Sequence, residues 1–248
     1  MDGYEKILKG GCAILAVVVM LITTASAETG MSNTKYTTVN NYDYRYWSLI
    51  ANNVEGRVDA DAVAGLDGMN YAPVGYMGAQ ARLYSSSGVL KASSTWVYNE
   101  GTSYPTASGS LTYKTTSGYY YSKGQVKFYD GEGYITYTSA ATPNFAPTRS
   151  VISDKNVIIQ KNDNGEIYGS GLFLDEIGVQ PDLIIAEGIN GEIGYVKAED
   201  LNDAEIETPE QAVTKMLNEI HYEIPLYDSD GITVIGSFML SPVEDINE

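Results

Sequence analysis

The alternation of apolar and polar positions predicts β-strands in the first half of the chain. Residues 78–84 place Ala79, Ala81 and Leu83 between polar neighbours, and residues 89–99 alternate in the same way. A period of two puts the apolar side chains on one face of a strand. Short turns rich in Gly, Ser and Asp separate these runs, so the pattern predicts an antiparallel β sandwich or barrel. Residues 58–69 (VDADAVAGLDGM) predict a short helix or a loop.

The second half opens with the strongest hairpin signal of the sequence. Two apolar runs, residues 183–186 and 193–196, flank the dipeptide Asn190-Gly191. Asn and Gly both tolerate positive φ, which the two central residues of a type I′ turn require. We therefore expect a hairpin with a tight turn at this dipeptide.

The end of the chain predicts one helix and one more hairpin. Thr208 is a capping residue, Pro209 fits the first helical position, and Gln211 completes a capping box. Residues 222–227 and 232–240 form apolar runs on either side of a turn. The fold class expected is thus mainly β, with an N-terminal antiparallel β sandwich or barrel and a smaller C-terminal α+β module of two hairpins and one helix.

Charge divides the chain into two parts. Residues 28–150 contain nine acidic and nine basic residues, whereas residues 151–248 contain 21 acidic and four basic residues, which accounts for the formal net charge of −17. We therefore expect a Tyr-rich β domain over residues 28–150 and an acidic α+β module over residues 151–248. Nucleic acid and anionic lipid are disfavoured as partners of the acidic module, because both would be repelled.

The first 27 residues have the features of a signal peptide. Lys6 and Lys9 precede a ten-residue apolar run at residues 13–22, and Ala25-Ser26-Ala27 fits the cleavage pattern. A membrane-spanning helix needs about 20 apolar residues, so this run is short for a permanent anchor. We expect cleavage after Ala27 and a secreted, extracellular protein, with an uncleaved N-terminal anchor as the alternative. Contact with the membrane is expected only through this segment before cleavage.

Two stretches resemble exported bacterial proteins. PDLIIAEGINGEIGYVKAEDL (181–201), followed by TPEQA (208–212) and IPLYDSDGITVIGSF (224–238), resembles a C-terminal module of secreted proteins of Gram-positive bacteria. GYMGAQARLYSSSGVLKASSTWVYN (75–99) and YYYSKGQVKFYDGEGY (119–134) resemble small exported β proteins of the same group. The resemblance implies export and a two-part layout, and it carries over no catalytic residue.

Residue types limit the chemistry that can be expected. After residue 27 there is no cysteine and one histidine, His221, so no Cys–His pair exists and a catalytic triad has one possible base. Tetrahedral zinc sites need several His or Cys ligands. Calcium remains open, although the turns at residues 162–165 and 228–231 do not match the EF-hand register. Asp130 and Glu132 lie in a Gly-flanked turn, as expected of a solvated hairpin tip. We therefore predict no catalytic residue, no metal ligand and no cofactor.

Tyrosine is the residue type that suggests a ligand-binding surface. Sixteen of the 21 tyrosines lie between residues 28 and 150. Tyrosine offers a flat apolar face and a polar hydroxyl, which suits either a binding surface or, in place of Phe, the core of the sandwich. If the rings form a stacking platform for sugar or peptide, the candidate residues are Trp96, Tyr98, Tyr119, Tyr121, Tyr134 and Tyr137.

The sequence therefore predicts an exported protein without enzymatic activity. Its expected partner is a cell-envelope glycan or an extracellular protein, bound through the Tyr-rich β domain. A secreted, bacteriocin-like antagonistic protein is the first alternative, and a cell-wall-acting hydrolase is the second.

Overall fold

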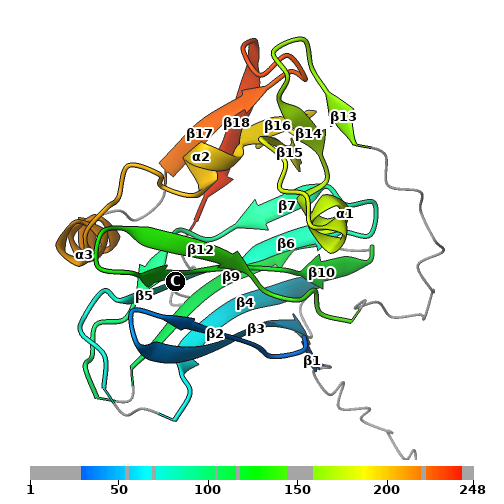
Figure 1. Ribbon diagram of the computed structural model, residues 1–248. Helices are drawn as coiled ribbons and strands as arrows, with labels where there is room; N and C mark the ends of the chain where they lie inside the picture. Colours follow the sequence, from blue (N-terminus) through cyan, green and yellow to red (C-terminus); the bar gives the residue numbers. More distant parts are fainter. Residues whose placement is uncertain are drawn as a thin grey trace, which may run out of the picture.

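The computed structural model describes residues 29–53, 56–68, 71–103, 105–115, 118–143, 159–218 and 222–241. The expected signal segment, the expected boundary at residue 150 and His221 all lie outside these residues. Strands make up 51% of the structure and helices 11%. These proportions confirm the predicted fold class, a mainly β protein with a smaller α+β part (Figure 1).

One layer of the sandwich is an antiparallel sheet in the order β1-β3-β4-β9, with β2 also paired to β3. Its strands are β1 (Thr29–Met31), β2 (Lys35–Val39), β3 (Tyr42–Asn53), β4 (Arg57–Leu66) and β9 (Thr106–Lys114).

The expectation of a helix or loop over residues 58–69 is wrong, because most of this segment belongs to β4. Val58, Ala60, Ala62 and Ala64 are buried, and residues 59 and 61 between them are only partly so. The period-two pattern is therefore present, but small alanines carry it. Alanine suits a central strand that another sheet covers closely.

The second layer bends from one sheet into another. A four-stranded sheet contains β5 (Met77–Gln80), β8 (Val97–Tyr98), β11 (Gln125–Tyr129) and β12 (Tyr134–Thr138). The strands β6 (Arg82–Ser85), β7 (Leu90–Ser93) and β10 (Tyr120–Ser122) continue it as part of a nine-stranded sheet. The predicted strand 78–84 thus changes sheet at Ala81, whose N–H donates to Ser94 Oγ at 2.9 Å.

The sandwich core lies between these two layers. Tyr44 and Ala62 from the first layer pack against Ala79 and Phe128 from the second, and the rings of Tyr44 and Phe128 stack with centroids 4.0 Å apart. The layers approach so closely at Gly109 that an added Cβ would lie 2.6 Å from the carbonyl oxygen of Ala79. Glycine is required there because any side chain would push the sheets apart.

The C-terminal half extends the nine-stranded sheet and adds short helices. β7 pairs in parallel with β15 at Leu90 and Ala186, and with β18 at Ser93 and Leu240. The elements of this half are β13 (Gln160–Lys161), β14 (Ile167–Gly169), α1 (Gly171–Leu174), the 3₁₀ helix η1 (Asp175–Ile177), β15 (Leu183–Glu187), β16 (Ile193–Lys197), α2 (Ala198–Leu201), α3 (Pro209–Asn218), β17 (Tyr222–Tyr227) and β18 (Val234–Leu240).

The predicted hairpin forms between β15 and β16, but the expected turn type is wrong. The N–H of Gly188 donates to Glu192 O at 2.8 Å, which closes a three-residue loop, and the N–H of Gly191 donates to Gly188 O at 2.9 Å. Gly191 has a φ of +85°, whereas Asn190 is not among the residues with positive φ. A three-residue loop needs only one residue in the left-handed region, and Gly191 supplies it. Asn190 therefore does not need a positive φ.

The predicted start of α3 is confirmed in detail. Thr208 Oγ1 accepts from the N–H of Gln211 at 3.3 Å, and Gln211 Oε1 accepts from the N–H of Thr208 at 3.1 Å. These reciprocal bonds are the capping box. They fix where α3 begins, and so place its apolar side against β8, where Ala212 packs with Trp96 and Tyr98.

Candidate functional site at the junction of the two halves

Three of the six candidate aromatic residues come together, and α3 covers them. The ring centroids of Trp96 and Tyr98 lie 6.4 Å apart, and those of Tyr98 and Tyr134 lie 5.6 Å apart. Trp96 and Tyr98 are each 3% exposed, and Ala212 of α3 belongs to the same buried cluster. This trio is therefore part of the core rather than an open stacking surface.

The other three candidates do not belong to the cluster around Trp96 and Tyr98. Tyr121 is buried among residues of the C-terminal half, including Leu172. Tyr119, two residues earlier in the chain, is half-buried. Tyr137 is half-buried on β12 and lines a pocket. The structure thus does not bring the six rings into one platform, and Tyr137 is the candidate that points to a site.

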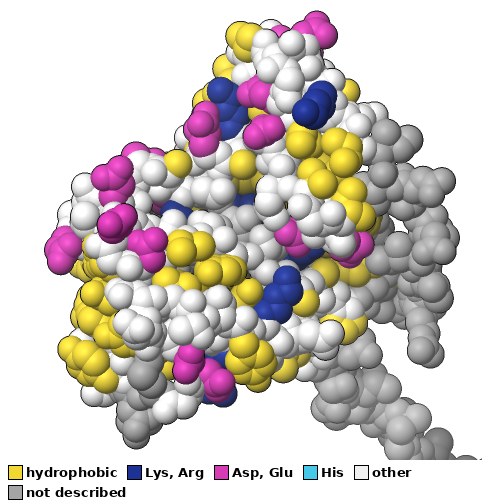
Figure 2. All heavy atoms as spheres, viewed as in Figure 1, with side chains coloured by type: hydrophobic (Ala, Val, Ile, Leu, Met, Phe, Trp, Pro, Cys, Tyr) yellow, Lys and Arg dark blue, Asp and Glu magenta, His cyan; other side chains and the backbone are white. Residues whose placement is uncertain are grey.

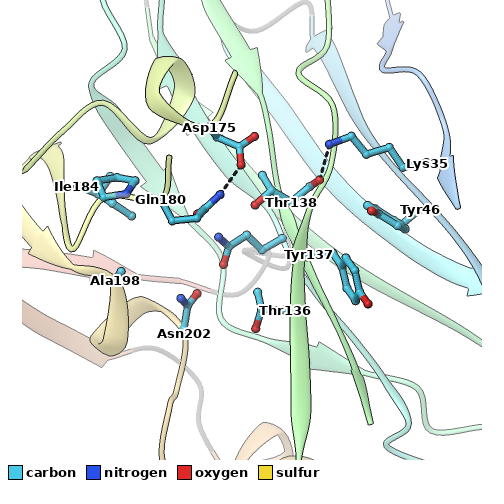
Figure 3. A pocket seen from close by; sticks show the side chains of 12 residues that line it. Lys35, Tyr46, Thr136, Tyr137, Thr138, Asp175, Gln180, Ile184, Ala198 and Asn202 are labelled. Carbon is cyan, nitrogen blue, oxygen red and sulfur yellow. Dashed lines mark hydrogen bonds between the residues drawn. The ribbon is translucent and has the colours of Figure 1, made fainter. Parts of the chain in front are cut away.

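The pocket has a volume of about 410 Å³ and lies where β12 faces the C-terminal half (Figure 3). Figure 2 shows the hollow between these two parts, with basic side chains visible in it. The sandwich supplies Lys35, Tyr46, Gln125, Thr136, Tyr137 and Thr138 to its lining, and the C-terminal half supplies Asp175, Gln180, Pro181, Ile184, Ala198 and Asn202.

Hydrogen bonds hold the polar side chains at the rim. Lys35 Nζ donates to Thr138 O at 2.9 Å, and Gln180 Nε2 donates to Asp175 Oδ1 (Figure 3). The second carboxylate oxygen of Asp175 pairs with Lys123 Nζ at 2.8 Å. Lys123 is 3% exposed, so this ion pair is largely shielded from water. Asp175 is therefore fixed in position, with its charge balanced by Lys123.

Gln125 lines the pocket and holds a buried acceptor that no described residue meets. Its side chain is 6% exposed, and its Oε1 has no hydrogen-bond partner among the described residues. A buried polar atom without a partner costs about 1–3 kcal/mol. The atom is closed to solvent, so a bound molecule would reach it only after the Gln125 side chain turned toward the pocket.

Two buried cations lie behind the pocket and both bond to Asn202. Arg82, which is 1% exposed, donates from Nε to Gln80 Oε1 at 2.8 Å and from Nη2 to Asn202 Oδ1 at 2.9 Å. Lys127 Nζ bonds to the carbonyl oxygen of Asn202 and lies 4.4 Å from the ring centroid of Trp96.

Burial and neighbouring charges shift two pKa values at this junction. The pKa of Lys127 is lowered from 10.5 to about 8, chiefly because burial disfavours its charge, while Asp203 acts in the opposite direction. The pKa of Tyr46 is raised, first by burial and then by Tyr137 and Asp175. Tyr46 therefore stays a neutral hydroxyl, able to donate or accept.

The pocket offers groups for binding more than for catalysis. Asp175 is the one carboxylate among its lining residues, and hydrolysis of a glycoside by paired acids needs two. Asp130 accepts the N–H groups of Glu132 and Gly133 at 2.9 Å each, so this acidic pair builds the β11–β12 turn, as expected of a hairpin tip. Among the described residues, no group of three or more His, Cys, Asp or Glu side chains is arranged to hold a metal ion.

Sequence reasoning missed Lys35, Gln125, Asp175 and Asn202. Gln125 and Lys127 alternate with apolar Val126 and Phe128, which normally indicates a solvent-facing side of a strand. Nothing local in the sequence says that another part of the chain covers that side.

Comparison with protein-family models, with curated proteins and with solved structures found no match to this chain. Within the described part of the chain, no helix is both long and apolar enough to cross a bilayer.

Proposed function

We propose that this is an exported, non-enzymatic protein of a Gram-positive bacterium that binds a glycan of the cell envelope or its surroundings. The observation that carries the binding proposal is the pocket between β12 and the C-terminal half. There the side chains of Tyr46 and Tyr137 meet the amides of Gln125, Gln180 and Asn202. Export rests on the charged, apolar and small-residue pattern of residues 1–27.

The lining of the pocket suits a sugar better than an apolar ligand or a protein surface. A sugar ring has hydroxyl groups that both donate and accept, and amide side chains offer both functions. An aromatic ring such as that of Tyr137 can pack against the C–H face of the sugar. A volume of about 410 Å³ lies within the usual range of roughly 300–1,000 Å³ for small-ligand sites. We therefore expect one or two sugar units in the pocket.

The test is retention on polysaccharides and on purified cell walls. The full chain is expected to be retained, and Tyr137→Ala is expected to lose most of the retention because it removes the ring that lines the pocket. Tyr36→Ala is the matched control, since Tyr36 is 64% exposed on β2 and does not line the pocket. Absence of retention on every glycan tried, or equal loss for both variants, would contradict the proposal.

A further inference from the structure

We infer that the ligand of this pocket is an acidic sugar, in which a carboxylate accompanies the hydroxyl groups, as in a uronic acid. The inference rests on the proposed function for the sugar, and on the charges around the pocket for the carboxylate. It runs against the formal net charge of −17, which would lead one to expect a cationic ligand.

One cation lines the pocket and three lie behind it. Lys35 lines it directly, Arg82 and Lys127 each bond to the lining residue Asn202, and Lys123 bonds to the lining residue Asp175. In a chain with 15 Lys and Arg against 32 Asp and Glu, such a gathering sets this site apart from the rest of the molecule.

Arg82 is the cation that most clearly lacks a counter-charge. Its hydrogen-bond partners are the neutral side chains of Gln80, Asn202 and Tyr84, and no carboxylate among the described residues forms an ion pair with it. Moving a guanidinium out of water is costly unless an anion lies nearby. A carboxylate bound beside Asn202 would supply that anion.

Lys127 also forms no ion pair with a carboxylate of the described residues, although the nearby carboxylate of Asp203 favours its charged form. Its ammonium group contacts the carbonyl oxygens of Asn202 and Asp203 and the face of Trp96. A carbonyl dipole and a ring quadrupole stabilise an ammonium less than a full negative charge does. Arg82, on which no carboxylate in the described ranges acts, therefore leaves an excess of positive charge on the Asn202 side of the pocket.

The acidic residues nearby do not cancel this excess. Asp175 is balanced by Lys123 at 2.8 Å, and Asp203 by Lys215 at 3.0 Å. Glu205 shares Lys215 with Asp203, so these two acids together face the two cations Lys215 and Lys127.

Helix α2 adds two further acids. Glu199 is 66% exposed and lies 3.7 Å from Lys197, whereas Asp200 forms no ion pair within the described part of the chain. With the partners of these acids included, the described residues on and behind the pocket thus comprise six cations and five carboxylates, a positive balance of one charge. The cations are Lys35, Arg82, Lys123, Lys127, Lys197 and Lys215, and the carboxylates are Asp175, Glu199, Asp200, Asp203 and Glu205.

The neutral groups of the pocket fit the rest of a sugar acid. Arg82 occupies Asn202 Oδ1, and the Nδ2 donors of Asn202 have no partner among the described residues, so they can meet a carboxylate. The hydroxyl groups of Thr136 and Tyr137, which line the pocket, can accept from a sugar hydroxyl. A donor set beside an acceptor matches a molecule that carries both a carboxylate and hydroxyls.

The experiment is calorimetric titration of the full chain with D-glucuronate and with D-glucose, which differ in the carboxylate. We expect glucuronate to bind at least about tenfold more tightly, and its affinity to fall as salt is raised. Sodium acetate and inorganic phosphate are the charge-only probes and should bind more weakly than glucuronate. Lys35→Gln should weaken glucuronate binding about threefold, while Lys114→Gln, on an exposed residue of β9 outside the pocket, should leave it unchanged.

Lys127→Met tests the buried charge, because methionine keeps most of the apolar stem. It should lower the affinity for glucuronate about tenfold and leave that for glucose unaltered. If this variant does not fold, Lys35→Gln and the salt dependence still decide the matter.

Each contrary outcome has a distinct meaning. Glucose binding as tightly as glucuronate would overturn the acidic-sugar inference and leave the proposed function standing. Acetate or phosphate binding as tightly as glucuronate would overturn it too, because the pocket would then recognise an anion without the sugar. Binding of none of the probes would overturn the inference, and the proposed function would then be judged by retention on polymeric glycans.

Discussion

The second layer of the sandwich, which contains β5, β6 and β11, has an apolar inner face and a polar outer face. On the inner face, Ala79 and Phe128 pack into the apolar core of the sandwich. On the outer face lie Gln80 and Lys127, which are the chain neighbours of Ala79 and Phe128. They are polar, and they are buried because the C-terminal half covers them. Residues one position apart in the chain thus enter a dry core and a hydrogen-bonded junction.

The difference shows what each face contributes. Burial of apolar surface stabilises the inner face directly. A buried cation such as Arg82 or Lys127 costs free energy that its neutral partners offset only in part. The junction is therefore expected to contribute less to stability and more to recognition, and neighbouring residues allow this to be measured.

The largest difference is expected between Phe128→Ala and Lys127→Met. Phe128 is fully buried and stacked on Tyr44, so its truncation should lower the free energy of unfolding by about 3–5 kcal/mol. Lys127→Met removes a buried charge and keeps most of the volume, so the change should stay within about 1 kcal/mol or be stabilising. Denaturant unfolding measures both, and an equal loss for the two variants would remove the distinction between the faces.

The pH dependence of stability is the next largest effect. The pKa of Lys127 is about 8 in the folded protein and 10.5 when unperturbed, so the folded protein releases this proton first. Between pH 8 and pH 10 the unfolded chain binds more protons, and the free energy of unfolding should therefore rise, by up to about 3 kcal/mol over the full interval. Unfolding curves across this range measure the rise, and Lys127→Met should abolish it.

Above pH 10 the buried tyrosines reverse the trend. Burial, with nearby tyrosines adding to it, raises the pKa of Tyr44 and of Tyr98, so both stay protonated in the folded protein after they ionise in the unfolded chain. The stability that they contribute is complete below pH 10 and is lost above it. A free energy of unfolding that falls steadily from pH 8 would contradict the assignment for Lys127.

A smaller effect is expected at Asn202, which joins the two halves. Asn202→Ala removes the acceptor of Arg82 Nη2 but keeps the carbonyl oxygen that holds Lys127, so the loss should be about 1–3 kcal/mol. Asn218→Ala is the matched control, because Asn218 is exposed at the end of α3 and bonds within its own helix. Thermal unfolding of both variants checks the difference, and no loss at Asn202 would mean that Arg82 finds another acceptor.

The smallest effect concerns the helix that covers Trp96 and Tyr98. Thr208→Ala removes one half of the capping box of α3 and should cost about 1 kcal/mol. Thr214→Ala lies in the exposed middle of the same helix and should cost nothing, because alanine favours the helix. Equal values for the two threonines, read from denaturant midpoints, would contradict the role of the cap.

The sequence predicted the inner face well and the outer face poorly. Alternation in residues 78–84 indicated correctly that Ala79, Ala81 and Leu83 share a face, because that periodicity is local. It did not indicate that Arg82 is buried, since the groups that cover it come from residues 120 positions away. The same limit explains the aromatic candidates. For Trp96 and Tyr98 the sequence allowed either a stacking surface or the core, because it predicted the helix at residue 208 but not that this helix packs on them. Tyr137 lines the pocket together with Pro181 and Asn202, which are distant in the sequence.

The most direct test is an NMR titration of the full chain with D-glucuronate, followed through side-chain amide resonances. The central claim predicts saturable shifts of the side-chain NH₂ groups of Gln125, Gln180 and Asn202, all of which line the pocket. The NH₂ group of Asn164, which bonds to Asp230 O at the far hairpin turns, should not shift. Shifts centred on Asn164, or no shift at saturating ligand, would contradict the claim that the junction of the two halves is the binding site.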